Sequence, residues 1–366
     1  MKNEELHAVA DGGDYLKVFA CTAVMLQSVL GFALGLTQPV ALQRGLAWAY
    51  LLVKFTAPAF ICGILLTTMR TTARRQPTYR YYLKQQWSAL FFPTICWTLA
   101  YMLIFPGLQQ QRAYHDGLSF VWQFVNGNAA PHLWYNTMML QMIFLMPLFW
   151  AIRRLIHSRW TAWWTLGLTA IGYLAWVVWY TLRVYPTAQF TDWYLLDRIF
   201  LGFFPYAILG ILAWYGWSTV QRQLRRWWWL LLVIGVVALV EQDRTLLDWS
   251  LPVSFSHTSY YLPATVIYIL SIIGLILALA GHQQSRHSRW LPVIHRLAGY
   301  AYPSYLANVF WLQLIWLLGG AAFTRQHVLL GIASCYLLTW CWSFGFTALL
   351  DKALKWRKTR WQERNR

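Results

Sequence analysis

Several ionisable side chains lie inside or at the ends of long apolar runs, where a charge is costly unless it is paired or used. Lys54 stands in the run LLVKFTAPAF, and Asp14 and Lys17 open the run DYLKVFACTAVMLQSVLGF. His132 begins another run, APHLWYNTMML. Inside a membrane such groups usually mark substrate sites or proton pathways. Each also has a structural explanation: snorkelling for Lys54, an i,i+3 ion pair for Asp14 and Lys17, and an interfacial position for His132.

The composition indicates that lipid is the solvent for most of this chain. Of the 366 residues, 58% are hydrophobic and 11% are charged, whereas soluble domains are about a quarter charged. The 25 Trp residues suit membrane interfaces, where the ring is apolar and its N–H stays hydrated. The five Cys residues show no spacing typical of metal ligands, so we predict no metal site.

The apolar runs predict an all-α, polytopic transmembrane helix bundle, because about 20 apolar residues are needed to cross a bilayer. About ten spans are expected, near 15–36, 46–69, 87–108, 132–152, 160–182, 194–216, 226–240, 261–281, 297–318 and 328–350. We therefore divide the chain into a cytoplasmic N-terminal segment (1–14), a transmembrane domain (15–350) and a basic cytoplasmic tail (351–366). Prolines within the spans predict kinked helices and a cavity at mid-membrane. These are Pro58, Pro93, Pro147, Pro205 and Pro303.

The basic residues orient these spans. Of the 30 Lys and Arg residues, 23 fall in alternate loops and at the two chain ends, while the acidic residues divide evenly between the faces. This is the positive-inside pattern, and it places both termini in the cytoplasm. It also explains the net charge of +18 by topology and contact with lipid headgroups, without a nucleic-acid partner. Asp197 and Arg198 then lie on the outer side, at the start of the sixth span.

The order and placement of several runs resemble the acyltransferase 3 family of integral membrane proteins. Within it, the chain is most similar to the branch that modifies or exports bacterial surface polysaccharides, such as the intercellular-adhesin O-acyltransferases. The resemblance covers nearly the whole chain. It rests on the runs YLKVFACTAVMLQS, KFTAPAFICGILLTT, TYRYYLKQQWSALFFP, HLWYNTMMLQMIFLMPLFW, FLGFFPYAILGILAWY and GYAYPSYLANVFW.

The resemblance implies transfer of an acyl group, commonly acetyl, from cytoplasmic acyl-CoA to a carbohydrate hydroxyl at or beyond the outer face. The first helix of the family carries a basic residue, ten intervening residues and a His. A cation at the cytoplasmic end can hold the CoA phosphates, and a His deeper in the helix can take the proton of the acceptor hydroxyl. The helical rise separates the two by about 16 Å.

This sequence keeps the cation as Lys17 but has Ser28 where the family has His. A late His in a Tyr-Leu-x-His pattern is replaced by Asn308. Lysine lacks the planar fork with which arginine binds phosphate, and a serine hydroxyl carries an acyl group only when a neighbouring group activates it. The His-Leu-Trp of the fourth span is retained at His132 and Trp134.

The family also has two arginines three apart, shortly before the proline of the third span. Here those positions hold Gln86 and Ala89, and Arg80 and Lys84 stand one or two turns earlier as candidate replacements.

Two functions follow from the resemblance. The first is a membrane O-acyltransferase that moves acetyl from acetyl-CoA to a cell-envelope or exopolysaccharide sugar in the bacterial plasma membrane. Its expected residues are Lys17, Ser28 and Asn308 for catalysis, Lys17, Arg80 and Lys84 for the CoA phosphates, and Lys54, His132 and Trp134 for the acceptor. The second is a catalytically silent relative that acts in polysaccharide export or as a partner of a polysaccharide synthase.

Overall fold

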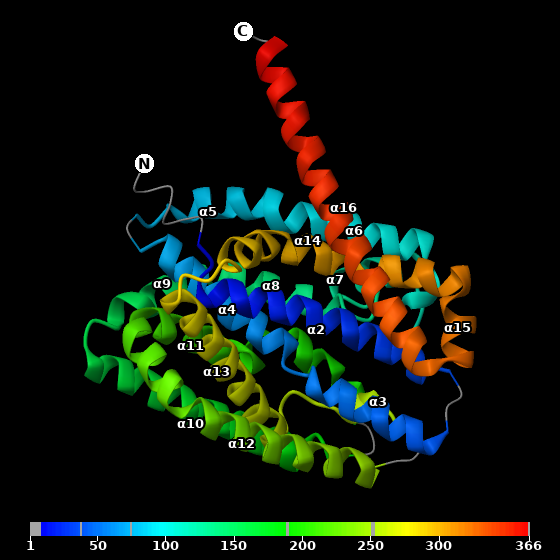
Figure 1. Cartoon of the computed structure of the whole chain (residues 1–366), viewed down its shortest axis with the longest axis horizontal. Coiled ribbons are helices and arrows are strands. Elements are labelled where there is room, and N and C mark those ends of the chain that lie inside the picture. The colour runs from blue at the N-terminus through cyan, green and yellow to red at the C-terminus, as the bar shows by residue number, and fades with distance from the viewer. Residues whose placement is uncertain (1–8, 37–38, 74, 188–189, 250–252, 365–366) are drawn as a thin grey trace.

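The computed structural model describes residues 9–36, 39–73, 75–187, 190–249 and 253–364, and all regular elements within these ranges are helical (Figure 1). The first half of the chain forms α2 (Gly12–Leu34), α3 (Val40–Leu52), α4 (Thr56–Thr71), α5 (Tyr79–Gln86), α6 (Phe92–Ile104), α7 (Gly117–Val125), α8 (Trp134–Phe144) and α9 (Met146–Leu155). The second half forms α10 (Arg159–Arg183), α11 (Phe204–Tyr215), α12 (Trp217–Trp249), α13 (Pro263–Ser285), α14 (Leu291–Ile315), α15 (Ala321–Gln326) and α16 (Val328–Arg364).

Most predicted spans are present as long helices. Among the described residues, eight helical stretches are long and apolar enough to cross a membrane, and α8 with α9 forms a ninth across a 56° bend. The predicted sixth span, 194–216, contains an α-helix of only 12 residues, α11, which is enough for about 18 Å. Pro205 in its first turn sets where this α-helix begins, and short 3₁₀ segments precede it. The transmembrane bundle is thus confirmed, with eight or nine candidate spans among the described residues where about ten were predicted, while the cytoplasmic placement of the termini stays a prediction.

Helix α2 lies in the middle of the bundle, where α3, α4, α13, α14 and α16 pack against it (Figure 1). Its start is fixed by Asp11, whose side chain accepts a hydrogen bond from the Asp14 backbone N–H while the Asp14 side chain accepts from the Asp11 N–H. This reciprocal cap satisfies two backbone donors that would otherwise lack partners. The helix that carries Lys17 and Ser28 is therefore anchored at its N-terminus and held on several sides.

The outer helices present their apolar side chains to lipid. Only 11% of the best spanning window of α10 is buried, against 72% for the stretch of α3 and α4, so α10 lies at the periphery. Its outward face carries large apolar residues that would be unfavourable in water. They include Trp160, Trp163, Trp164, Leu168, Ile171 and Leu174.

Four of the five prolines follow an interruption of their predicted span. Pro147 follows the 56° break between α8 and α9, and Pro93 follows a π-helical turn at the start of α6. Pro58 follows the break between α3 and α4, and Pro205 follows the 3₁₀ segments before α11. Pro303 lies inside α14 without ending it.

Two glycines let α4 approach its neighbours closely. A Cβ atom at Gly63 of α4 would lie 2.8 Å from the backbone oxygen of Gly13 in α2. A Cβ atom at Gly210 of α11 would collide with the backbone oxygen of Cys62 in α4. Small residues at such crossings allow the backbone contact that drives helix association in lipid.

We predict that Gly63→Ala and Gly210→Ala each destabilise the fold by about 1–3 kcal/mol, because the added methyl group must push two helices apart. Gly172→Ala in α10 is the matched control, since nothing lies within 4 Å of a Cβ atom there. Thermal unfolding of the protein in detergent tests this, and equal melting temperatures for the three variants would contradict the packing described.

Candidate active site

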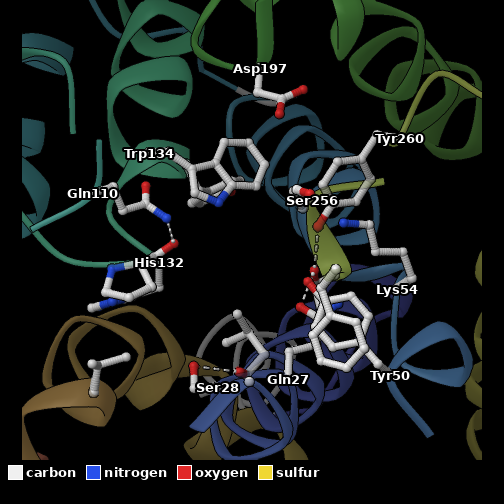
Figure 2. Close-up of a pocket in the computed structure, with 18 of the residues that line it drawn as sticks. Gln27, Ser28, Tyr50, Lys54, Gln110, His132, Trp134, Asp197, Ser256 and Tyr260 are labelled. Carbon is white, nitrogen blue, oxygen red and sulfur yellow. Dashed lines mark hydrogen bonds between the residues drawn. The ribbon is translucent and has the colours of Figure 1, made fainter. Parts of the chain in front are cut away.

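A cavity of about 690 Å³ opens beside the second half of α2 (Figure 2). Its wall comes from α2, the junction of α3 and α4, the start of α8, α14 and the segment before α13. Lining residues that the sequence singled out are Ser28, Lys54, His132, Trp134 and Asp197. A second cavity of about 420 Å³ shares Lys54, Trp134 and Asp197 with it, so the two adjoin.

Ser28 and Asn308, the two positions where the resemblance expects histidine, lie side by side. The Ser28 hydroxyl is 3.0 Å from the backbone oxygen of Val24, to which it donates, and 3.3 Å from Asn308 Oδ1. Asn308 is fully buried, and its Nδ2 donates to the backbone oxygen of Tyr305. The structure thus brings these two predicted residues together, but no base contacts the serine hydroxyl among the described residues.

His132 reaches the same cavity from a turn-rich segment, 126–133, between α7 and α8. Gly127 shapes this segment: its φ of 78° is left-handed, and a Cβ atom there would lie 2.7 Å from the Leu133 backbone oxygen. Only glycine meets both conditions without strain. The close return of the chain at Gly127 positions His132 directly before α8.

The imidazole of His132 is held on one side and lacks a partner on the other. Its Nε2 is 3.3 Å from the backbone oxygen of Leu306, and the Tyr305 hydroxyl donates to the His132 backbone oxygen. The rings of Tyr101 and Tyr305 pack edge-on against it, at centroid distances of 5.4 and 5.1 Å. Nδ1 is buried and has no hydrogen-bond partner among the described residues. With the proton on Nε2, Nδ1 carries a free lone pair and can accept a proton.

A polar chain missed by the sequence analysis crosses the opposite wall. The Thr56 hydroxyl lies 3.1 Å from Gln27 Oε1 and 3.1 Å from the Tyr260 hydroxyl. The Nε2 atom of Gln27 and the hydroxyl of Tyr135 are buried without partners in the described chain. The amide of Gln27 inside the apolar run VMLQSVL was the one sequence signal for this wall.

Trp134 and the Asp197 carboxylate complete the cavity. The Trp134 ring packs against Tyr260 and Phe203, at centroid distances of 5.6 and 5.9 Å. Asp197 lies at the far end of the opening from Ser28 (Figure 2). Burial raises the pKa of the Asp197 carboxyl, and the nearby positive charges of Arg198 and Lys54 oppose that rise.

Lys17 lies away from this cavity, at the opposite end of α2. Its ammonium is 2.7 Å from Asp14, and the second oxygen of Asp14 is 2.8 Å from His295 Nδ1. Arg70 pairs with Asp11 at 3.0 Å in the same region. The predicted i,i+3 ion pair is present, so Lys17 is not a free cation.

Arg80 and Lys84 are exposed on α5, and no hydrogen bond or ion pair among the described residues joins either to Lys17. Gln86 ends α5 and Ala89 lies in the π-helical turn that follows. The structure therefore does not assemble the predicted cations into one cluster, and their binding of CoA phosphates stays a prediction. The described residues also contain no group of three or more His, Cys, Asp or Glu side chains that fits a metal ion.

We predict that Asp14→Asn lowers the stability of the fold by about 3 kcal/mol, because it leaves the largely buried Lys17 ammonium without its counter-charge. Asp351→Asn is the control, since Asp351 pairs with Lys355 at the surface and should change stability little. Unfolding in detergent followed by tryptophan fluorescence measures both. Equal losses of stability in Asp14→Asn and Asp351→Asn would argue against a structural role for the Asp14–Lys17 ion pair.

Comparison with known proteins agrees with this architecture. A family model described as an acyltransferase domain matches residues 12–348, from the first turn of α2 into α16. No curated protein and no solved structure gives a significant match. Since the family model covers most of the chain, including both walls of the cavity, this multi-pass membrane protein belongs to the acyltransferase 3 family.

Proposed function

We propose that the protein transfers an acetyl group from cytoplasmic acetyl-CoA to a hydroxyl of a cell-envelope or exopolysaccharide glycan, in the bacterial plasma membrane. One observation carries this proposal: His132 lines the cavity beside α2, and its imidazole Nδ1 is buried and without a hydrogen-bond partner in the described chain. Acyl transfer to a hydroxyl uses a nearby group that can accept the hydroxyl proton.

The lining of the cavity supports a sugar as the acceptor. Its volume of about 690 Å³ lies in the ordinary range for small-molecule sites. Aromatic rings, among them Trp134 and Tyr260, alternate with amides and hydroxyls, among them Gln27 and Gln110. Aromatic faces pack on the C–H surface of a sugar ring, and amides can both donate to and accept from its hydroxyls.

The end of α2 that carries Lys17 is where we propose that acetyl-CoA binds. Lys17 and Ser28 stand eleven residues apart on one continuous helix, or about 16 Å. In the proposal the CoA phosphates bind at the cytoplasmic end to the exposed Arg80 and Lys84, and Lys17 takes part only where a phosphate displaces its pairing with Asp14. The acyl-bearing arm then extends along α2 toward the cavity.

The reaction is a direct transfer. The acceptor hydroxyl oxygen attacks the thioester carbonyl carbon, its proton passes to His132 Nδ1, and the C–S bond breaks as the CoA thiolate leaves. The thiolate then takes up a proton. Ser28 does not serve as a nucleophile in this scheme, since the acceptors within reach of its hydroxyl proton are Val24 O and Asn308 Oδ1, and no base among the described residues contacts it. Ser28 and Asn308 instead orient the acceptor or the carbonyl group.

A second function is a catalytically silent relative in polysaccharide export, or a partner of a polysaccharide synthase. The contact between Ser28 and Asn308 favours it, because both expected histidines are replaced by residues that satisfy each other. In this case the cavity binds glycan without transferring an acyl group.

We predict that His132→Gln lowers the rate of acetyl transfer 10²- to 10⁴-fold, because it removes the proton acceptor. Membrane vesicles containing the protein, radiolabelled acetyl-CoA and isolated envelope glycan provide the assay. His115→Gln is the control, since His115 is exposed in the loop before α7. Full activity of the His132 variant would remove this residue from the mechanism. No transfer by the wild type with any acyl-CoA, together with loss of glycan export on deletion, would favour the silent relative.

The variant Ser28→His tests the same site by adding an imidazole to it. A second imidazole beside the cavity should raise the rate of transfer, because it restores the base that the resemblance expects in α2. The same vesicle assay measures it, with Thr22→His as a control one and a half turns below. An unchanged rate in a folded Ser28 variant would show that the base is not what limits this protein.

A further inference from the structure

Lys54 is a buried cation at a break in a membrane span. Helix α3 ends at Leu52 and α4 begins at Thr56, and Lys54 lies in the turn between them. The residue is only 6% exposed, yet it lines both adjoining cavities. A lysine that snorkelled to the interface would be exposed at its tip, so burial at the cavity argues against that explanation.

The Lys54 ammonium contacts Tyr50 and Tyr260, hydrogen-bonds to Tyr50, and interacts with the Asp197 carboxylate from beyond ion-pair distance. Nζ lies 4.1 Å from the centroid of the Tyr260 ring and 5.4 Å from that of Tyr50. Lys54 takes part in none of the ion pairs within 4.0 Å among the described residues. The carboxylate of the cavity, Asp197, lies across the opening (Figure 2). Cation–π contact offsets only part of the cost of burying a charge, so the ammonium keeps the capacity to bind an anion.

The charged groups around the two cavities sum to an excess of positive charge. Lys54 and Arg198 face one carboxylate, Asp197. The guanidinium of Arg198 already donates to the neutral oxygens of Tyr194, Gln110 and Asn128. Arg198 lines only the smaller cavity, so Lys54 is the cation among the lining residues of the larger one, where it stands beside the aromatic and amide groups that suit a sugar.

We propose that the acceptor is an acidic glycan, whose carboxylate binds the Lys54 ammonium between Tyr50 and Tyr260. This inference rests on the proposed function, since it names the class of glycan that the cavity takes. Asp197, across the opening, then accepts hydrogen bonds from sugar hydroxyls and repels a second acidic group. The result is a site that selects both the presence and the position of the negative charge.

The test measures binding without acyl-CoA, so its result does not depend on whether transfer occurs. The protein is placed in phosphatidylcholine nanodiscs and titrated calorimetrically with a tetrasaccharide of alternating glucuronic acid and N-acetylglucosamine. The neutral probe is the same tetrasaccharide with its carboxyl groups reduced to alcohols. We expect the acidic probe to bind at least about tenfold more tightly, as for a charged hydrogen bond in a partly buried site.

Four variants assign the preference to Lys54. Lys54→Met should abolish the preference for the acidic probe, and Lys54→Arg should keep it. Arg112→Gln removes an exposed cation from another outer loop and should also keep it. Asp197→Asn should increase the preference about threefold, an effect that a damaged fold would not produce.

Three results would overturn the proposal. The first is equal affinity for the two probes, including no measurable binding of either. The second is a preference that survives Lys54→Met. The third is a melting temperature raised by phosphatidylglycerol in the wild type but not in Lys54→Met, without discrimination between the probes. That third result would assign Lys54 to a lipid headgroup instead.

Discussion

Hydrocarbon offers no hydrogen-bond partners, and this constraint governs where the polar groups of the bundle lie. Many are paired between helices far apart in sequence: Tyr101 donates to the Leu306 backbone oxygen, and the hydroxyls of Thr94 and Tyr302 are 2.5 Å apart. Three buried polar atoms without partners in the described chain belong to side chains that line one cavity. They are Gln27 Nε2, His132 Nδ1 and Tyr135 OH. Other buried polar atoms without partners, such as both amide atoms of Asn136, lie outside this lining, so the cavity is one of several places where internal pairing is incomplete.

Helix α2 is one rigid element that connects two different environments. Its first turn is charged and fully paired, through Asp14, Lys17 and His295. Its second half faces the cavity at Gln27 and Ser28. Close packing at Gly13 and Gly63 fixes α2 against α4, so the spacing between the two ends cannot drift. A donor bound at one end must therefore extend along the helix to reach the other.

The sequence was sufficient for the fold class and insufficient for the site, for physical reasons. Hydropathy is a local property, so it predicted most spans and failed at 194–216, where Pro205 and 3₁₀ segments leave a short helix. The contact between Ser28 and Asn308 joins residues 280 positions apart, and no local pattern encodes it. The motif that contains His132 was visible in the sequence. Its unpartnered Nδ1 depends on Leu306 and Gly127, and only the folded chain reveals that.

The free-energy cost of burying unpaired polar groups at the cavity helps to distinguish a protein that binds a ligand there from one with a purely structural role. A buried polar atom without a partner costs about 1–3 kcal/mol, and a buried charge costs more. Replacing His132 and Lys54 by apolar residues of similar size would therefore be expected to stabilise a bundle whose only task is structural. Ser28 and Asn308 do contact each other, so within the cavity the cost falls on Gln27, Tyr135, the His132 imidazole and the Lys54 ammonium. Among the described residues, the His132 imidazole lacks a proton donor at Nδ1 and the Lys54 ammonium lacks an anion within ion-pair distance. An acidic glycan would bring both, a hydroxyl for the imidazole and a carboxylate for the ammonium.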